Sequence, residues 1–206
     1  MRQNKIYDPM LTIGVTGGVG AGKSRVLEYL QDCFGAVILK ADEIGHDVME
    51  PGNPCYEPVL RILGDGVVLP DGRIDRRAAA AIIFKDEEKR KAMNAVIHPA
   101  VKMIILGVLQ RLKEQKQKLA VVETALLLED NYQVFLDDVW YVYADEEIRI
   151  KRLSESRGYS EEKSRDIMAG QTKDRTFRAQ ADFIIDNSGD FEDTKEQIKR
   201  KLTELL

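Results

Sequence analysis

The sequence contains few cysteines and histidines. Of its 206 residues, two are cysteines (Cys33 and Cys55) and two are histidines (His46 and His98). Two histidines cannot form a histidine-rich metal site, and the two cysteines have neither metal-ligand spacing nor further cysteines close to them. We therefore expect both cysteines to be free thiols of a cytosolic protein instead of a disulfide.

The sequence also lacks long apolar runs and an excess of basic charge. No uninterrupted apolar stretch approaches the roughly 18 residues that a membrane span needs, and residues 1–5 are not followed by the apolar run of a signal peptide. The net charge of -4 argues against a surface dominated by a nucleic-acid groove. We expect a cytoplasmic protein without nucleic-acid or membrane partners, either a monomer or a weak homo-oligomer.

One segment of the chain, residues 17–24, is rich in glycine and matches the pattern G-x-x-x-x-G-K-[ST]. In this pattern the backbone presents successive N–H groups to phosphates, the lysine reaches the β- and γ-phosphates, and the final hydroxyl binds Mg²⁺. The residues expected to bind ATP are Gly17, Gly18, Val19, Gly20, Ala21, Gly22, Lys23 and Ser24, with Ser24 as the Mg²⁺ ligand. The segment follows a predicted strand and precedes a predicted helix, which favours a phosphate-binding loop over a simple turn.

Short apolar runs alternate with helical patterns along the chain. Strands are predicted at residues 11–15, 36–39, 119–122, 138–143 and 183–185. Helices are predicted at residues 24–34, 76–84, about 99–116, 146–157, 160–171 and 197–206, with Pro99 in the first turn of the third of these. Buried strands separated by helices indicate an α/β fold with a mostly parallel sheet, whose ligands bind at the carboxyl ends of the strands.

Two carboxylates follow predicted strands and are therefore expected at this edge of the sheet. Asp42 suits a group that orients an acceptor hydroxyl or accepts its proton, and the structural alternative is a helix N-cap. Glu123 follows an apolar strand as a Walker-B carboxylate does, and an ordinary strand-end residue is equally compatible. The sequence has no Asn-Lys-x-Asp motif for guanine, so a small-molecule kinase is favoured over a GTPase. A regulatory protein that hydrolyses ATP slowly remains the alternative from another class.

Further short motifs are spread over almost the whole chain. They lie at residues 13–24, 41–42 with His46, 51–52, 72–77, 97–99, 126–129, Gln171 and 181–189. This ordered set resembles the dephospho-coenzyme A kinase family. The resemblance implies a P-loop three-layer sandwich with a five-stranded parallel sheet in the order 2-3-1-4-5. It also implies ATP-dependent phosphorylation of the ribose 3′-hydroxyl of dephospho-coenzyme A, the last step of coenzyme A synthesis, with Mg²⁺.

The resemblance also implies regions and roles. A single domain would have its core at residues 10–42, 118–145 and 176–206, a helical substrate-side region at about 43–117, and a lid at about 146–175. The residues expected to act in catalysis are Lys23, Asp42 and Arg157. Asn187 would lie near the adenine of ATP, and Asp42, His46, Arg76, His98 and Glu123 would bind the acceptor.

The chain departs from the family pattern at a few positions. Lys40 stands where an acidic residue is common, Glu123 where aspartate is usual, and Ala125 where proline is usual. Ser156 occupies a place often held by the lid arginine, with Arg157 one position along. One position rotates a helical side chain by about 100°, so the lid role stays open between Arg149, Arg152 and Arg157. A kinase for another nucleotide-like acceptor also stays open.

Overall fold

The computed structural model describes residues 10–127 and 130–206, which form two compact units. Unit 1 comprises the described residues up to Leu39 and from Leu112 to Leu206, and unit 2 comprises Lys40–Arg111. Residues 1–9, Leu128 and Glu129 lie outside the described residues, so the predictions for the N-terminal segment and for the end of the motif at 126–129 are not addressed by the structure.

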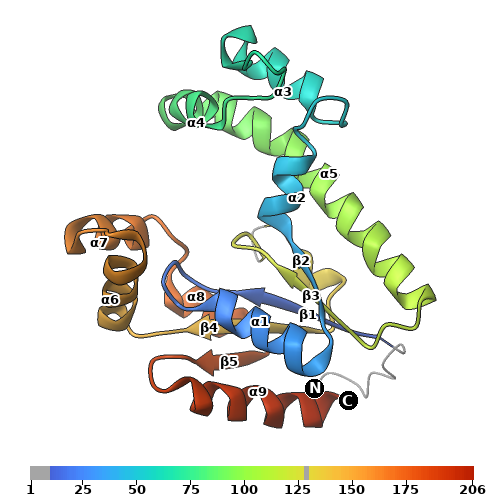
Figure 1. Ribbon diagram of the computed structural model, residues 1–206, viewed down its shortest axis with the longest axis vertical. Coiled ribbons are helices and arrows are strands. Elements are labelled where there is room, and N and C mark those ends of the chain that lie inside the picture. The colour runs from blue at the N-terminus through green and yellow to red at the C-terminus, as the bar shows by residue number, and fades with distance from the viewer. Residues whose placement is uncertain (1–9, 128–129) are drawn as a thin grey trace. The chain divides into compact units, whose positions relative to one another are not determined.

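Unit 1 is built on a five-stranded sheet in the order β2-β3-β1-β4-β5 (Figure 1). Its strands are β1 (Leu11–Thr16), β2 (Val37–Lys40), β3 (Leu119–Glu123), β4 (Asp138–Tyr143) and β5 (Phe183–Asp186). β1 pairs in parallel with β3 and β4, and β4 pairs in parallel with β5. Every residue of β1 is buried, including Thr12 and Thr16 between its apolar residues, as expected for a parallel strand that is covered on both faces. The predicted parallel sheet and strand order are confirmed.

Five helices in the described part of unit 1 lie between or after its strands along the chain. They are α1 (Lys23–Phe34), α6 (Glu146–Arg157), α7 (Glu161–Ala169), α8 (Asp174–Gln180) and α9 (Phe191–Leu205), with a 3-10 turn at Tyr132–Val134. Apolar side chains of α1 and α9, among them Leu30 and Ile198, pack with β-strand residues in one core, and Figure 1 shows both helices beside the sheet. The predicted bounds of α6 agree with the structure, whereas α8 was not predicted.

Unit 2 is helical, as the sequence pattern predicted for this region. Its helices are α2 (Ala41–Asp47), α3 (Tyr56–Leu63), α4 (Arg76–Lys85) and α5 (Glu87–Glu114), with a 3-10 turn at Asp65–Val67, and α5 extends three residues beyond the unit. The side chain of Asp75 caps α4 by accepting hydrogen bonds from the N–H groups of Arg77 and Ala78 at 2.9 and 3.1 Å. A single antiparallel bridge joins Val68 and Ile74.

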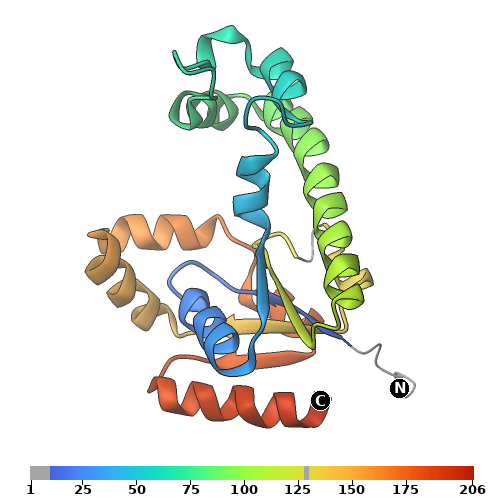
Figure 2. The same cartoon turned by 45° about the vertical axis from the view of Figure 1, so that its right-hand side comes forward.

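The prediction that a helix begins near Pro99 was wrong. α5 begins at Glu87 and continues through Pro99, and Figure 2 shows it as one unbroken helix. An interior proline removes one helical hydrogen bond and clashes with the preceding turn, at a cost of about 3 kcal/mol. The buried side chains of α5 recur every four residues, at Ile97, Val101, Ile105 and Leu109. Their packing holds both sides of the proline in one helix.

α5 is also the one helix in the described part of the chain that is long and apolar enough to cross a membrane. Its most apolar window has a mean hydropathy of 1.7, and 17% of that window is buried. Only the length and composition of α5 match those of a membrane span, and helices of proteins without a membrane span can have the same length and composition. The window contains Asn94, His98 and Lys102, so it is not an uninterrupted apolar stretch.

Candidate active site

The glycine-rich segment forms the loop between β1 and α1. β1 ends at Thr16 and α1 begins at Lys23, with Gly22 as its N-cap. Gly22 has a φ of 90°, and a Cβ at this position would collide with the side-chain amide of Asn187. A Cβ on Gly17 would lie 2.5 Å from the carbonyl oxygen of Val142. No side chain caps the N-terminus of α1, which is the end of a helix that binds phosphate groups.

Lys23 lies folded back over this loop. Its Nζ donates a hydrogen bond to the carbonyl oxygen of Gly17 at 2.8 Å and lies 3.9 Å from Oε1 of Glu123 at the end of β3. The Lys23 side chain is 18% exposed and that of Glu123 is 14% exposed, so the pair is largely shielded from water. Ser24, the next residue of α1, is exposed. The structure thus places the predicted Lys23 and Glu123 together, within unit 1.

The side chain of Asn187 binds the backbone of the loop. Its Nδ2 donates to the carbonyl oxygen of Ala21 at 2.7 Å, and its Oδ1 accepts a hydrogen bond from the hydroxyl of Thr194 at 2.9 Å. Arg152 donates to the same carbonyl oxygen of Ala21 at 3.3 Å and to that of Asn187 at 2.8 Å. The Asn187 amide is buried, and both its nitrogen and its oxygen form hydrogen bonds within the protein. These contacts fit a role in supporting the phosphate loop better than a direct contact with adenine.

Arg149 also contacts this loop. Its Nε donates to the carbonyl oxygen of Val19 at 2.8 Å, and its Nη2 donates to Oε1 of Gln171 at 3.0 Å. The same oxygen of Gln171 accepts a hydrogen bond from the N–H of Val19 at 3.0 Å. Burial lowers the pKa of Arg149 from its usual value, because a desolvated cation is less stable than a hydrated one. An anion bound beside this guanidinium would restore the lost stabilisation.

Two cavities border the first glycines of the loop. The larger, of about 480 Å³, is lined by Gly18, Arg149 and Gln171 together with side chains of α7 and α8. The smaller, of about 190 Å³, is lined by Gly17, Gly18, Ala125, Leu126 and residues 170–172 with Phe177. Both cavities include Gly18 and Gln171, so open space lies directly beside the phosphate loop. This space could accept the phosphate end of a nucleotide.

An aromatic pair closes one side of the larger cavity. The rings of Tyr141 in β4 and Phe177 in α8 are stacked with their centroids 4.8 Å apart. Burial, together with a hydrogen bond to Asp174, raises the pKa of Tyr141. Its hydroxyl therefore stays protonated and can donate a hydrogen bond at neutral pH. Sequence analysis missed this pair because Phe177 is the only buried residue of the short helix α8.

The segment predicted to act as a lid, at about residues 146–175, contains α6, α7 and the start of α8. Arg165 of α7 forms ion pairs with Glu146, Glu147 and Glu161, two of them on α6. Arg157, the predicted lid arginine, is the last residue of α6 and is exposed, with its guanidinium 6.0 Å from the ring of Tyr159. Arg149 and Arg152 contact the phosphate loop, so among the three candidates these two lie at the site.

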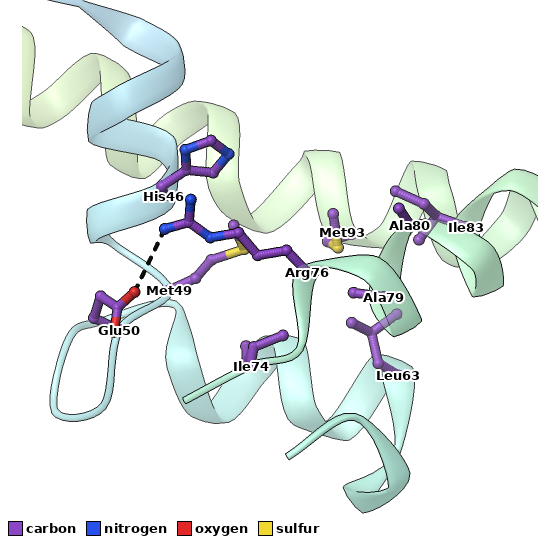
Figure 3. Close-up of a pocket in the computed structure, with 10 residues that line it drawn as sticks. All are labelled: His46, Met49, Glu50, Leu63, Ile74, Arg76, Ala79, Ala80, Ile83 and Met93. Atoms are coloured by element: carbon purple, nitrogen blue, oxygen red, sulfur yellow. Dashed lines mark ion pairs between the residues drawn. The ribbon is translucent and has the colours of Figure 1, made fainter. Parts of the chain in front are cut away.

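The remaining predicted residues belong to unit 2. Asp42 is exposed in the first turn of α2, whose N-cap is Lys40, so the alternative that Asp42 is an N-cap was wrong. His46 follows one turn later on α2, and it lines a pocket together with Arg76 of α4. His98 lies half-buried on α5 beside Ile97 and does not line that pocket. His46 and Arg76 thus share one pocket (Figure 3), and Asp42 lies on the same helix as His46.

Comparisons with known proteins show what this chain is similar to. The family model described as dephospho-CoA kinase matches residues 11–193. The dephospho-CoA kinase of Geobacillus kaustophilus (strain HTA426) is 36% identical over 188 residues, which cover 91% of this chain and 93% of that protein. The crystal structure of TT1252 from Thermus thermophilus has a TM-score of 0.81 and 31% identity, covering 96% of this chain and 98% of that one.

A more distant structure shares the fold alone. Shikimate kinase from Acinetobacter baumannii, in complex with shikimate, has a TM-score of 0.51 and 19% identity, covering 98% of this chain and 96% of that one. This likeness concerns the arrangement of helices and strands alone. Because the family model and the Geobacillus relative both match most of the chain, the protein belongs to the dephospho-CoA kinase family.

Proposed function

We propose that this protein transfers the γ-phosphoryl group of ATP to the ribose 3′-hydroxyl of dephospho-coenzyme A, giving coenzyme A and ADP in the last step of coenzyme A synthesis. The observation that carries the proposal is the phosphate loop, in which Lys23 lies over Gly17 and open cavities border Gly17 and Gly18. The family to which the chain belongs supports the choice of acceptor.

Each residue of the site has a role in this proposal. The N–H groups of the loop and of the first turn of α1 bind the phosphates, and Lys23 neutralises charge on the transferring group. Asp42 orients the acceptor hydroxyl and accepts its proton. His46, Arg76 and His98 of unit 2 bind the acceptor, and Glu123 positions Lys23 through their ion pair. Asn187 and Arg152 hold the loop at Ala21.

Mg²⁺ is the metal that suits these residues. Residues 10–127 and 130–206 contain no group of three or more His, Cys, Asp or Glu that could hold a metal ion. Mg²⁺ bound with a nucleotide needs only one or two protein ligands, because the phosphates and water supply the rest. The exposed hydroxyl of Ser24 is the ligand that we assign. When bound, the ion neutralises charge on the phosphates.

The lid contacts distinguish between the candidate arginines. We expect Arg149→Ala to lower kcat by about 100-fold, because one charged donor beside the developing phosphate charge is lost. Arg157→Ala is expected to have a much smaller effect, since its exposed side chain contacts Tyr159 instead of the loop. Lys151→Ala, an exposed cation on the same helix, is the control. Steady-state kinetics with saturating ATP measures the three, and an equal loss in Arg157→Ala would contradict the assignment.

The remaining features of the proposal concern organisation and location. We propose the core at residues 10–42, 118–145 and 176–206, the acceptor-side region at about 43–117 and the lid at about 146–175. We further propose that the protein acts in the cytoplasm, as a monomer or weak homo-oligomer, without nucleic-acid or membrane partners. The net charge of -4 supports the lack of a nucleic-acid partner.

A direct assay tests the function. The protein is incubated with Mg-ATP and dephospho-coenzyme A, and the products are identified by mass spectrometry and by the position of the new phosphate. Nucleoside monophosphates and shikimate are run as alternative acceptors, and ATP hydrolysis is measured without an acceptor. We expect phosphate on the 3′-hydroxyl of dephospho-coenzyme A. Slow hydrolysis without transfer to any acceptor would favour the regulatory ATPase instead.

A further inference from the structure

Three hydrogen bonds join Arg149, Gln171 and the backbone of Val19 in a closed ring. Nε of Arg149 donates to the carbonyl oxygen of Val19 at 2.8 Å, and its Nη2 donates to Oε1 of Gln171 at 3.0 Å. The same oxygen of Gln171 accepts a hydrogen bond from the N–H of Val19 at 3.0 Å. Because a guanidinium is rigid and planar, bonds at two of its nitrogens fix both its position and its plane.

The guanidinium of Arg149 also lies against Gly18. A Cβ on Gly18 would collide with Nη2 and with the guanidinium carbon, so the arginine fills space that only glycine leaves at this position. Gly18, Arg149 and Gln171 all line the cavity of about 480 Å³ beside the phosphate loop. The ring of hydrogen bonds therefore holds a positive charge at the wall of this cavity.

The groups that hold Arg149 are neutral. Among the described residues, its guanidinium donates hydrogen bonds to a peptide carbonyl and to a side-chain amide. Glu146 and Asp174 also attract it, yet burial has the larger effect, so the pKa of Arg149 lies below its usual value. A carboxylate in place of the Gln171 amide would form an ion pair with the arginine. The amide instead binds the arginine and leaves its charge to attract a phosphoryl group.

We propose that Gln171 is a positioning residue for phosphoryl transfer, which holds Arg149 against the phosphate loop without neutralising it. This inference rests on the proposed function, because the charge that Arg149 would stabilise is that of the transferring phosphoryl group. Gln171 lies in the linker between α7 and α8, so the ring also ties this linker to the loop. Gln171 thus acts through Arg149 and not through a contact of its own with the phosphates.

Two substitutions of Gln171 separate position from charge. Gln171→Ala leaves the guanidinium with only its hydrogen bond to the carbonyl oxygen of Val19. Gln171→Glu keeps an acceptor oxygen and adds a negative charge beside Arg149. Gln180→Ala is the matched control, because Gln180 is an exposed glutamine at the end of α8 that lines neither cavity beside the loop. Thermal unfolding checks that each variant folds.

The first measurement is the rate of transfer in a single turnover, with enzyme in excess over dephospho-coenzyme A, so that product release does not enter. We expect Gln171→Ala to lower this rate about tenfold and to change the Kd for ATP by less than about threefold, because the charge is present but misplaced in the transition state. Gln171→Glu is expected to lower the rate and to raise the Kd for ATP, because the added charge repels the phosphates. Gln180→Ala should match the wild type.

A double-mutant cycle distinguishes positioning of Arg149 from a separate structural role. Because Gln171 is proposed to act through Arg149, we expect Gln171→Ala to lower the rate by less than about threefold further when Arg149→Ala is already present. A larger further loss, or a rate in Gln171→Ala within about threefold of the wild type, would overturn the proposal. A Gln171→Glu protein as fast as the wild type would overturn the requirement for a neutral amide.

A second measurement needs no acceptor. In protein with isotope-labelled arginine, the Nε–H signal of Arg149 is identified by its loss in Arg149→Ala, and its exchange with water is measured by NMR. We expect exchange to be about tenfold faster in Gln171→Ala, since one hydrogen bond no longer fixes the guanidinium, and unchanged in Gln180→Ala. Unchanged exchange in Gln171→Ala would overturn the positioning role. Failure of the wild-type protein to phosphorylate dephospho-coenzyme A would instead overturn the proposed function.

Discussion

Replacing Lys23 by alanine is expected to lower kcat about 1,000-fold, one of the two largest effects that the site predicts. The ammonium group contacts the start of the loop, with Nζ 2.8 Å from the carbonyl oxygen of Gly17. Negative charge builds up on the γ-phosphoryl group during transfer. In a site shielded from water, solvent cannot replace the stabilisation that this charge loses when Lys23 is removed. The measurement is kcat with saturating ATP and acceptor.

The control for Lys23→Ala is Arg25→Ala, which removes a cation from the same turn of α1. The Arg25 guanidinium lies 3.9 Å from the centroid of the Phe191 ring, so it is held on α9 and not over the loop. We expect Arg25→Ala to keep most of the activity. Thermal unfolding of both variants separates lost catalysis from lost folding. A Lys23→Ala protein with kcat within tenfold of the wild type would show that this lysine does not stabilise the transferred group.

Asp42→Asn is expected to lower kcat by about 100- to 10,000-fold while leaving the Kd for ATP nearly unchanged. Asparagine keeps the size of the side chain and cannot accept the proton of the acceptor hydroxyl. Asp42 is exposed in the first turn of α2, where its negative charge also favours the helix N-terminus. That electrostatic contribution is only about 0.3–1 kcal/mol, so the variant should fold.

Glu43→Gln provides the matched control for Asp42→Asn. Glu43 is the next residue of α2, is also exposed, and forms an ion pair with Lys40 at 2.9 Å. We expect its neutralisation to leave turnover close to that of the wild type. ATP binding is measured by calorimetry in all three proteins, and turnover by release of ADP. Wild-type turnover in Asp42→Asn would remove Asp42 from the catalytic assignment.

Helices were predicted less completely than strands, and particular residues show why. β1 and β4 are rich in apolar residues because both faces of a parallel strand are buried, and this made them recognisable. α8 has one buried side chain, Phe177, so no periodic pattern marks it. α9 begins at Phe191, whereas the prediction began at residue 197. The first turns were missed because their buried residues, Phe191 and Thr194, lie among charged ones. α5 continues through Pro99, where local propensity predicts a boundary.

The residues of the candidate site also differ in how far they could be predicted from the sequence. The phosphate loop is contiguous, so its glycines, Lys23 and Ser24 could be recognised from spacing. The lid arginine could not, because Arg149, Arg152 and Arg157 are alike in type and lie on one charged helix. Only contacts across the fold separate them, as when Arg149 donates to Val19, 130 positions away along the chain.

The sequence by itself determined the class of fold, the strands and their order, the phosphate loop and the family, since each depends on local patterns or on an ordered set of motifs. Tertiary structure decided which arginines reach the loop, that Asn187 supports Ala21, and that His46 and Arg76 line one apolar pocket. These features depend on side chains distant in the chain, whose meeting is governed by packing and burial and leaves no periodic signal in the sequence.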